Sequence, residues 1–426
     1  MSPFELAVQF LFQLGAILIV CRLVGLVAER LGQPPVVSEM IAGVCLGPSL
    51  LGALAPEVSA YLFPKESMKV LFPVAQIGLS LYMFIIGLEF RGDIVRQRVG
   101  TSVSVSLAGM AVPFGLGALS GWLMYRNTQL FPESIPLTAA MLFMGASMCI
   151  TAFPMLARII QHKGLTGTTL GTVVIGAGAI DDAAAWCMLA VVLASFTGDF
   201  TDAAFSIGGG FGYAVLVMGV VRPLLRRWAR GVEERGKLSD REYAMLLALM
   251  CLGAWWTERI HLHAVFGAFV MGAAMPRGVV SKSIIARTQP LAVALFLPLF
   301  FTYSGLNTRL GLLDESGLWL IALGVLAAAI VGKGVACWGA ARAAGISNRE
   351  AVGIGVLMNA RGMMELIIIN IGLERGVISP EIFAMLAIMA IVTTLMTSPI
   401  FELVLGGGRK LDGAPQSSAP APEHGH

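Results

Sequence analysis

Two adjacent carboxylates, Asp181 and Asp182, lie in the middle of an apolar run, within the stretch GAGAIDDAAAW. Each is about 13 residues from the ends of that run, which corresponds to ~20 Å of helix. An aspartate side chain is too short to reach water from that depth, and a charge so far inside an apolar segment is costly to keep. The pair is therefore a candidate site for a proton or a small cation.

The two carboxylates have different expected surroundings. Neighbouring positions on a helix point ~100° apart, so one aspartate can pair with a basic group while the other faces a cavity. Small residues on both sides, mainly Gly and Ala, leave room for water or an ion. Lys333, in the apolar stretch IVGKGVACW, is the expected partner of one aspartate. Such a buried pair either exchanges protons near neutral pH or serves only as a structural ion pair.

Two further apolar runs contain interruptions at corresponding places. In CITAFPMLA the proline cannot donate to the helix, and in LMNARGMME poor helix formers flank a charged arginine. Paired interruptions of this kind indicate a transporter binding site near the middle of the membrane. Arg361 and Glu365 are spaced for a salt bridge on one helix, which either neutralises both charges or sets the field at the ion site. The residues assigned to the interruptions are Thr151, Pro154, Asn359, Arg361 and Glu365.

The composition is that of an all-α polytopic membrane protein. Of the 426 residues, 57% are hydrophobic and 13% are charged, and the mean hydropathy of +0.81 is far above that of soluble domains. Charged or Pro/Gly-rich borders separate 13 apolar runs, each near the length that crosses a bilayer. The predicted spans are residues 4–26, 34–52, 68–88, 100–125, 135–158, 168–195, 203–221, 242–257, 262–278, 290–306, 316–340, 350–372 and 382–405.

The distribution of basic residues predicts the orientation of these spans. Of the 29 Lys and Arg residues, 21 fall in loops after odd-numbered spans, in the flanking helix ends or in the C-terminal tail, and six fall on the opposite side. Because cytoplasmic loops carry the excess of positive charge, we expect the N-terminus outside and the C-terminus in the cytoplasm. The first span lacks the basic start and cleavage site of a signal peptide. We therefore expect a multi-pass protein of the cell inner (plasma) membrane, in contact with the lipid bilayer.

An odd number of spans predicts two inverted halves. Two groups of six joined by a single crossing enter the membrane from opposite sides, and the two interruptions then fall in counterpart helices. The expected organisation is a first inverted repeat at 1–200, a linker helix with a basic cytoplasmic loop at 201–241, a second inverted repeat at 242–405 and a disordered cytoplasmic tail at 406–426.

Cysteine spacing, net charge and motif content exclude several classes of function. The six cysteines form no CxxC pair, so neither a disulfide framework nor a zinc site is indicated. The formal net charge of +3 is too small to indicate a nucleic-acid partner. An intramembrane aspartyl protease needs a second aspartate on another span, and a prenyl-transfer enzyme needs repeated aspartate motifs; the sequence has neither. We therefore expect no enzyme activity and no cofactor.

A carboxylate site open to two ions predicts exchange between them. The carboxylate binds a proton or, once deprotonated, a monovalent cation, and it gains little from holding both. If the loaded site faces each side of the membrane in turn, a proton gradient drives the cation in the opposite direction. Proton release from the paired lysine would add to the charge moved and make exchange sensitive to voltage. We therefore predict an antiporter in which the aspartate pair takes the transported metal ion and the proton.

Six stretches resemble the monovalent cation:proton antiporters, in the branch of Kef-like bacterial transporters and plant cation/proton exchangers. They are QPPVVSEMIAGVCLGPSLLG, ITAFPMLARII, GAIDDAAAW, HAVFGAFVMGAAMP, LPLFFTYSGLNT and MNARGMMELIIINIG. The resemblance implies the sodium/proton antiporter fold with crossed broken helices. It also implies a homodimer in which the fourth to sixth and eleventh to thirteenth spans move. Among the site residues, it implies that Asp182 binds the cation and the proton, and that Asp181 pairs with Lys333.

The residues leave one rival function and the identity of the cation open. A sodium-coupled symporter of an organic solute on a similar inverted-repeat scaffold is the alternative, although a titrating Lys333 suits protons as the coupled ion. The aspartate pair is compatible with Na+, K+ or Li+, and with one proton or more per cation.

Overall fold

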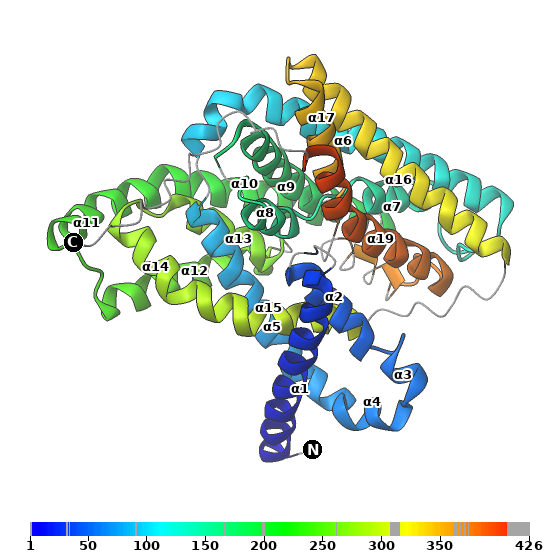
Figure 1. Cartoon of the computed structure of the whole chain (residues 1–426), viewed down its shortest axis with the longest axis horizontal. Helices are drawn as coiled ribbons and strands as arrows, with labels where there is room; N and C mark the ends of the chain where they lie inside the picture. The colour runs from blue at the N-terminus through cyan, green and yellow to red at the C-terminus, as the bar shows by residue number, and fades with distance from the viewer. Residues whose placement is uncertain are drawn as a thin grey trace, which may run out of the picture.

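The computed structural model of the chain is built from helices (Figure 1). It describes residues 2–30, 33, 35–89, 92–165, 167–197, 201–260, 262–306, 316–361, 365, 368–369, 372–373 and 375–406. The α-helices are α1 (Pro3–Arg30), α2 (Pro35–Leu46), α3 (Leu51–Leu54), α4 (Pro56–Leu62), α5 (Lys65–Glu89), α6 (Gly92–Asn127), α7 (Leu137–Cys149), α8 (Phe153–His162), α9 (Thr169–Thr197), α10 (Thr201–Leu216), α11 (Arg222–Arg235), α12 (Asp240–Arg259), α13 (Ala264–Ala274), α14 (Val279–Leu291), α15 (Leu297–Leu306), α16 (Ser316–Ala343), α17 (Asn348–Leu357) and α19 (Pro380–Leu405). Two π-helical turns, η1 (Val217–Val221) and η2 (Ala292–Phe296), join α10 to α11 and α14 to α15.

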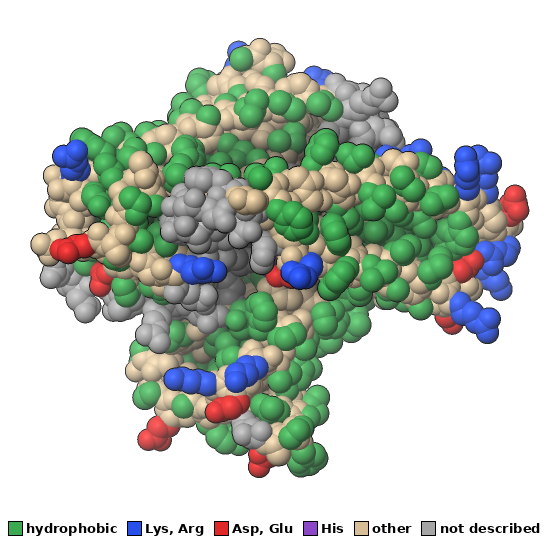
Figure 2. All heavy atoms as spheres, turned by 180° about the vertical axis from the view of Figure 1, so that it is seen from behind, with side chains coloured by type: hydrophobic (Ala, Val, Ile, Leu, Met, Phe, Trp, Pro, Cys, Tyr) green, Lys and Arg blue, Asp and Glu red, His purple; other side chains and the backbone are tan. Residues whose placement is uncertain are grey.

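Eight helical stretches in the described ranges are long and apolar enough to cross a membrane. They are Pro3–Arg30, Val37–Leu54, Lys65–Glu89, Arg98–Asn127, Ala204–Arg235, Val279–Tyr303, Gly317–Ala343 and Pro380–Leu405, with α7 and α13 as shorter apolar helices. Large hydrophobic side chains, such as Leu320 and Leu403, are exposed on them, and Figure 2 shows hydrophobic side chains spread over the surface. A surface of this kind suits contact with lipid.

Packing divides most of the described helices into two sets (Figure 1). In the first set, α6 packs on α7, α9 and α16, and α17 packs on α9, α16 and α19. In the second set, α5 packs on α13 and α15, α2 packs on α1 and α15, and α12 packs on α13. Contacts of α10 with both α9 and α12, and of α5 with α8, join the two sets. The aspartates of α9 and Lys333 of α16 therefore belong to the same set.

Two helix interruptions meet inside the first set. Helix α7 ends at Cys149, the next residue is extended, and α8 begins at Phe153. The physical reason is Pro154, which lacks the N–H that would continue the helix and is tolerated in the first turn of a new one. Helix α17 ends at Leu357, and the backbone N–H of Ala152 donates to the carbonyl of Ala360 at 3.2 Å. The glycine that follows Arg361 lies outside the described residues.

Several helices extend beyond the apolar runs that predicted them. The predicted span 203–221 is part of a helix that continues to Arg235, and the span 290–306 is preceded by helical residues from Val279 onward. A run of apolar residues marks what can lie in lipid, whereas good helix formers such as Arg, Leu and Glu continue the backbone hydrogen bonds in water. The first of these helices ends instead at Gly236, whose φ of 66° is left-handed.

Candidate ion-binding site

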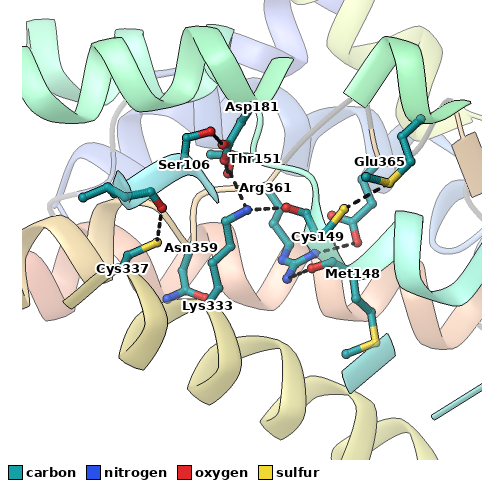
Figure 3. Close-up of polar contacts among 12 residues, drawn as sticks. Ser106, Met148, Cys149, Thr151, Asp181, Lys333, Cys337, Asn359, Arg361 and Glu365 are labelled. Carbon is teal, nitrogen blue, oxygen red and sulfur yellow. Dashed lines mark hydrogen bonds and ion pairs between the residues drawn. The ribbon is translucent and has the colours of Figure 1, made fainter. Parts of the chain in front are cut away.

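Asp181 is buried at the middle of α9, where side chains of three other elements meet it (Figure 3). Its Oδ1 atom accepts a hydrogen bond from the Ser106 hydroxyl of α6 at 2.5 Å. Its Oδ2 atom accepts one from the Thr151 hydroxyl at 2.6 Å and lies 3.4 Å from Nζ of Lys333. Both oxygens have partners, which offsets the cost of burying this carboxylate.

Lys333 reaches the site from α16 and is 0% exposed. Its ammonium group donates to the backbone carbonyl of Cys149, at the end of α7, and to Asp181. The structure therefore places Lys333 beside Asp181. The same ammonium group also binds backbone that the first interruption has freed from helical hydrogen bonding.

Arg361, in the second interruption, is also 0% exposed. Its Nη1 atom donates to the carbonyl of Ser147 at 3.3 Å and its Nη2 atom to the carbonyl of Met148 at 2.6 Å. Nη1 also lies 3.3 Å from Oε1 of Glu365, so the salt bridge between residues four apart is formed. The Thr394 hydroxyl of α19 accepts from the backbone N–H of Arg361 and donates to its carbonyl. One side chain therefore links the second interruption to the end of α7.

Each end of an interrupted helix carries a partial charge and binds side chains of the opposite charge. Three consecutive carbonyls at the C-terminus of α7 bind cationic side chains, Lys333 and Arg361, where the helix dipole is negative. At the N-terminus of α8, where the dipole is positive, the backbone N–H of Phe153 donates to Asp182. Two cations and one carboxylate are therefore held at the crossing by half-helix ends of opposite sign.

Asp182 differs from its neighbour because it is incompletely bonded. The side chain is buried, yet its Oδ1 atom has no hydrogen-bond partner in the described part of the chain. Gly178, one turn earlier on α9, lets α8 approach: a Cβ there would lie 2.9 Å from the Leu156 side chain. Carboxylate oxygens beside unwound backbone are the ligands by which such sites hold monovalent cations. Of the two aspartates, Asp182 is therefore the one with an oxygen available to a proton or cation.

Asn359 lies next to the helix that carries Lys333. Its Nδ2 atom donates to the carbonyl of Gly355 at 2.9 Å, and a Cβ at Gly334 would lie 3.1 Å from that same nitrogen. The glycine therefore permits the close approach of the Asn359 side chain to α16. Pro154 forms part of the backbone of α8, and its side chain lies outside the described residues.

Two hydroxyl residues of the site, Ser106 and Thr394, were not predicted from the sequence. Ser102 and Ser106 are four residues apart on α6 and both bond to α9, Ser102 through the carbonyl of Val173 at 3.3 Å. Two serines at this spacing in an apolar helix are a signal for a polar contact with a neighbour. The pairing of Thr394 with the backbone of Arg361 could not be predicted from residue types, because every residue except proline carries the same backbone N–H and carbonyl groups.

Ser106→Ala is expected to lower the free energy of unfolding by about 1.5–3 kcal/mol, because it removes a hydrogen bond to the buried charge of Asp181. Ser102→Ala, on the same face of α6, removes a bond to the carbonyl of Val173, and its expected cost is about 0.5–1.5 kcal/mol. Unfolding of the purified variants in detergent compares the two. An equal or smaller loss for Ser106→Ala would show that Asp181 does not depend on this hydroxyl.

Comparison with known proteins identifies the family of this chain. Residues 15–405 match the family profile described as sodium/hydrogen exchanger, transmembrane. The Na(+)/H(+) antiporter NhaS4 of Synechocystis is 40% identical over 382 residues, which cover 89% of this chain and 93% of that protein. The K(+)/H(+) antiporter 1 of Saccharomyces cerevisiae is 34% identical, and the match covers 100% of this chain and 49% of that protein.

A solved structure has the same fold. The sodium proton antiporter MjNhaP1 from Methanocaldococcus jannaschii superimposes with a TM-score of 0.67 over 94% of this chain and 98% of that chain, at 16% sequence identity. All these relatives are transporters and not enzymes, and none supports the alternative of a symporter for an organic solute. The chain is therefore a multi-span membrane protein that belongs to the sodium/hydrogen exchanger family, within the monovalent cation:proton antiporter superfamily.

Proposed function

We propose that the protein exchanges a monovalent cation, Na+ or K+, for protons across a membrane, with Asp182 as the shared binding site. The observation that carries the proposal is the Oδ1 atom of Asp182, which is buried and lacks a hydrogen-bond partner in the described ranges. Burying a carboxylate oxygen without a hydrogen-bond partner costs free energy. A bound proton or cation offsets that cost. Membership of an antiporter family supports the same chemistry.

Asp181 and Lys333 are proposed as an ion pair that titrates during exchange. A cation that enters beside Asp182 competes with the ammonium group for the adjacent carboxylate of Asp181, and Lys333 can then release a proton. More than one proton would then move per cation. Exchange of unequal charge responds to the membrane potential.

Alternating access would expose the site to each side of the membrane in turn. We propose that α6 to α9, α16, α17 and α19 move together against the remaining helices. The support is that these helices pack on one another and carry both aspartates, Lys333 and both interruptions. In this proposal the crossing of the two interruptions, at the hydrogen bond from Ala152 to Ala360, moves with the site.

The membrane arrangement follows from the same proposal. We propose 13 spans with inverted repeats at 1–200 and 242–405, joined by the linker helix and basic loop at 201–241, because a described helix overlaps each predicted span. The proposed tail at 406–426 lies, apart from its first residue, outside the described residues. The excess of basic residues on one side supports an outer N-terminus and a cytoplasmic C-terminus in the plasma membrane. A homodimer is part of the proposal through the family resemblance.

Everted membrane vesicles test the exchange. Two of the relatives named above are called antiporters of Na+ and one is called an antiporter of K+, so both cations are compared, together with Li+. Each cation is added separately to vesicles that hold a respiration-driven pH gradient, which a fluorescent amine reports. We expect at least Na+ or K+ to dissipate the gradient only in vesicles that contain the protein. If no cation does so while the protein is folded in the membrane, the proposal is wrong.

Lys333→Gln tests the role of the ion pair. We expect exchange to continue at a reduced rate but to lose its acceleration by an imposed membrane potential, because no second proton accompanies the cation. Proteoliposomes with and without a potassium-diffusion potential, set with valinomycin and assayed with Na+, provide the measurement. A variant that keeps the voltage response of the wild type would restrict Lys333 to a structural role.

A further inference from the structure

A second polar site lies away from the aspartates, where α11 meets the connection between α13 and α14. The pocket there has a volume of about 500 Å³. Its charged lining residues are Arg222, Arg226, Arg230, Arg277, Glu233 and Glu234. The exchange mechanism uses none of them, and four arginines against two glutamates leave the lining positive.

Three of the arginines recur every four residues along α11 and therefore share one face of the helix. Like charges at this spacing repel one another. The adjoining face of α11 buries Leu225, Ala229 and Val232 in an apolar cluster that also contains Val280 and Ile284 of α14. This packing prevents the helix from turning its arginines away from the pocket.

Two of these arginines are not bonded to an acidic group in the described part of the chain. Arg226 and Arg230 form neither a hydrogen bond nor an ion pair with any residue in the described part of the chain. Glu233 is already engaged, since its Oε1 atom accepts the backbone N–H of Val279 at 2.7 Å, at the start of α14. A guanidinium group with free donors is the side chain that best matches the oxygens of a phosphate group.

The position of the pocket along its helix indicates that the phosphate group belongs to a membrane lipid. The apolar helix that begins at Ala204 reaches Val221 after ~27 Å, close to the hydrocarbon thickness of a bilayer. The arginines of α11 follow within the next three turns, together with Trp228, an aromatic residue of the kind that favours the membrane interface. Basic side chains gather at this end of the molecule, at the right of Figure 2. A lipid headgroup lies at that depth.

We propose that this pocket binds the phosphate group of an anionic phospholipid, with Arg226 and Arg230 as the principal ligands and Arg222 and Arg277 completing the positive lining. Basic pockets between membrane helices at headgroup depth take such lipids. The site is independent of the ion-binding site and of the cation that is exchanged.

Thermal unfolding of the full-length protein in a neutral detergent tests the proposal. We expect phosphatidylglycerol to raise the melting temperature by a few degrees and phosphatidylcholine to leave it unchanged. The double variant Arg226→Gln/Arg230→Gln is expected to bind phosphatidylglycerol about 25-fold more weakly, because each basic residue near the membrane surface adds about 5-fold in affinity. The matched control is Arg227→Gln/Arg241→Gln, which removes two exposed charges from outside the pocket and should respond as the wild type does.

Native mass spectrometry supplies a second measurement that does not depend on unfolding. One fewer phosphatidylglycerol should remain bound to the pocket variant than to the wild type and the control. If inorganic phosphate stabilises the wild type as strongly as the lipid does, the ligand is free phosphate and the lipid assignment is overturned. The proposal also fails if the pocket variant keeps the full lipid response, or if the control loses as much as the pocket variant.

Discussion

Asp182→Asn is expected to reduce cation-dependent proton exchange to the level of vesicles that lack the protein. Asparagine has the same shape, and its carbonyl oxygen can still accept the backbone N–H of Phe153. It carries no negative charge and does not take up a proton in the physiological range, so it can hold neither ion. The measurement is the rate of dissipation of a pH gradient in everted vesicles on addition of Na+ or K+.

The same variant separates loss of function from loss of fold. Because Asp182→Asn removes a charge from a buried side chain whose Oδ1 has no partner in the described ranges, we expect its melting temperature to equal or exceed that of the wild type. Asp240→Asn is the matched control: its side chain is 97% exposed and pairs with Arg287 at the periphery, so exchange should be unchanged. Substantial exchange by Asp182→Asn at equal protein levels would contradict the proposed site.

Arg361→Gln is expected to cause the largest loss of stability, about 3–5 kcal/mol in the free energy of unfolding. The substitution leaves the carboxylate of Glu365 buried without its cation, and Oε2 of that residue already lacks a partner in the described part of the chain. It also removes the donors that bind the carbonyls of Ser147 and Met148 at the end of α7. Unfolding in mixed detergent and SDS micelles measures the change.

A double-mutant cycle identifies the cause of that loss. Adding Glu365→Gln to Arg361→Gln removes the unpaired charge, so the double variant should regain part of the lost stability, with a coupling energy of about 1–3 kcal/mol. Arg259→Gln, at an exposed helix end, should change stability by less than about 0.5 kcal/mol. If the single and double variants are equally unstable, the loss comes from the carbonyls of α7 and not from Glu365.

The charged members of the site could be predicted from the sequence because a membrane span rarely contains an ionisable residue without a use for it. Asp181, Asp182 and Lys333 each interrupt an otherwise apolar run, and the spacing of Arg361 and Glu365 indicates a salt bridge. The salt bridge is present, and Lys333 lies beside an aspartate. These features could be predicted because the apolar residues on either side of each charged residue indicate that it will be buried at a cost in free energy.

The lengths of several helices could not be predicted from apolar runs. Helix α11 continues the seventh predicted span by 14 residues, because its arginines support a helix as well as its leucines do. A hydrophobic run indicates which side chains can lie in lipid. The end of the helix depends instead on backbone hydrogen bonds and on a residue such as Gly236, which adopts a left-handed conformation. The arginine pocket lies on that unpredicted extension.

The sequence by itself determined that this is a multi-span membrane protein, that it carries acidic and basic groups inside spans, and that two helices are interrupted, because each of these is set by hydropathy or by residues such as Pro154. Only the tertiary structure shows that both oxygens of Asp181 have hydrogen-bond partners, whereas Oδ1 of Asp182 has none in the described part of the chain. The difference depends on Ser106, Thr151 and Lys333, which come from three other segments, and on carbonyls that any residue could supply. Their meeting is a property of the packing of helices far apart in the chain.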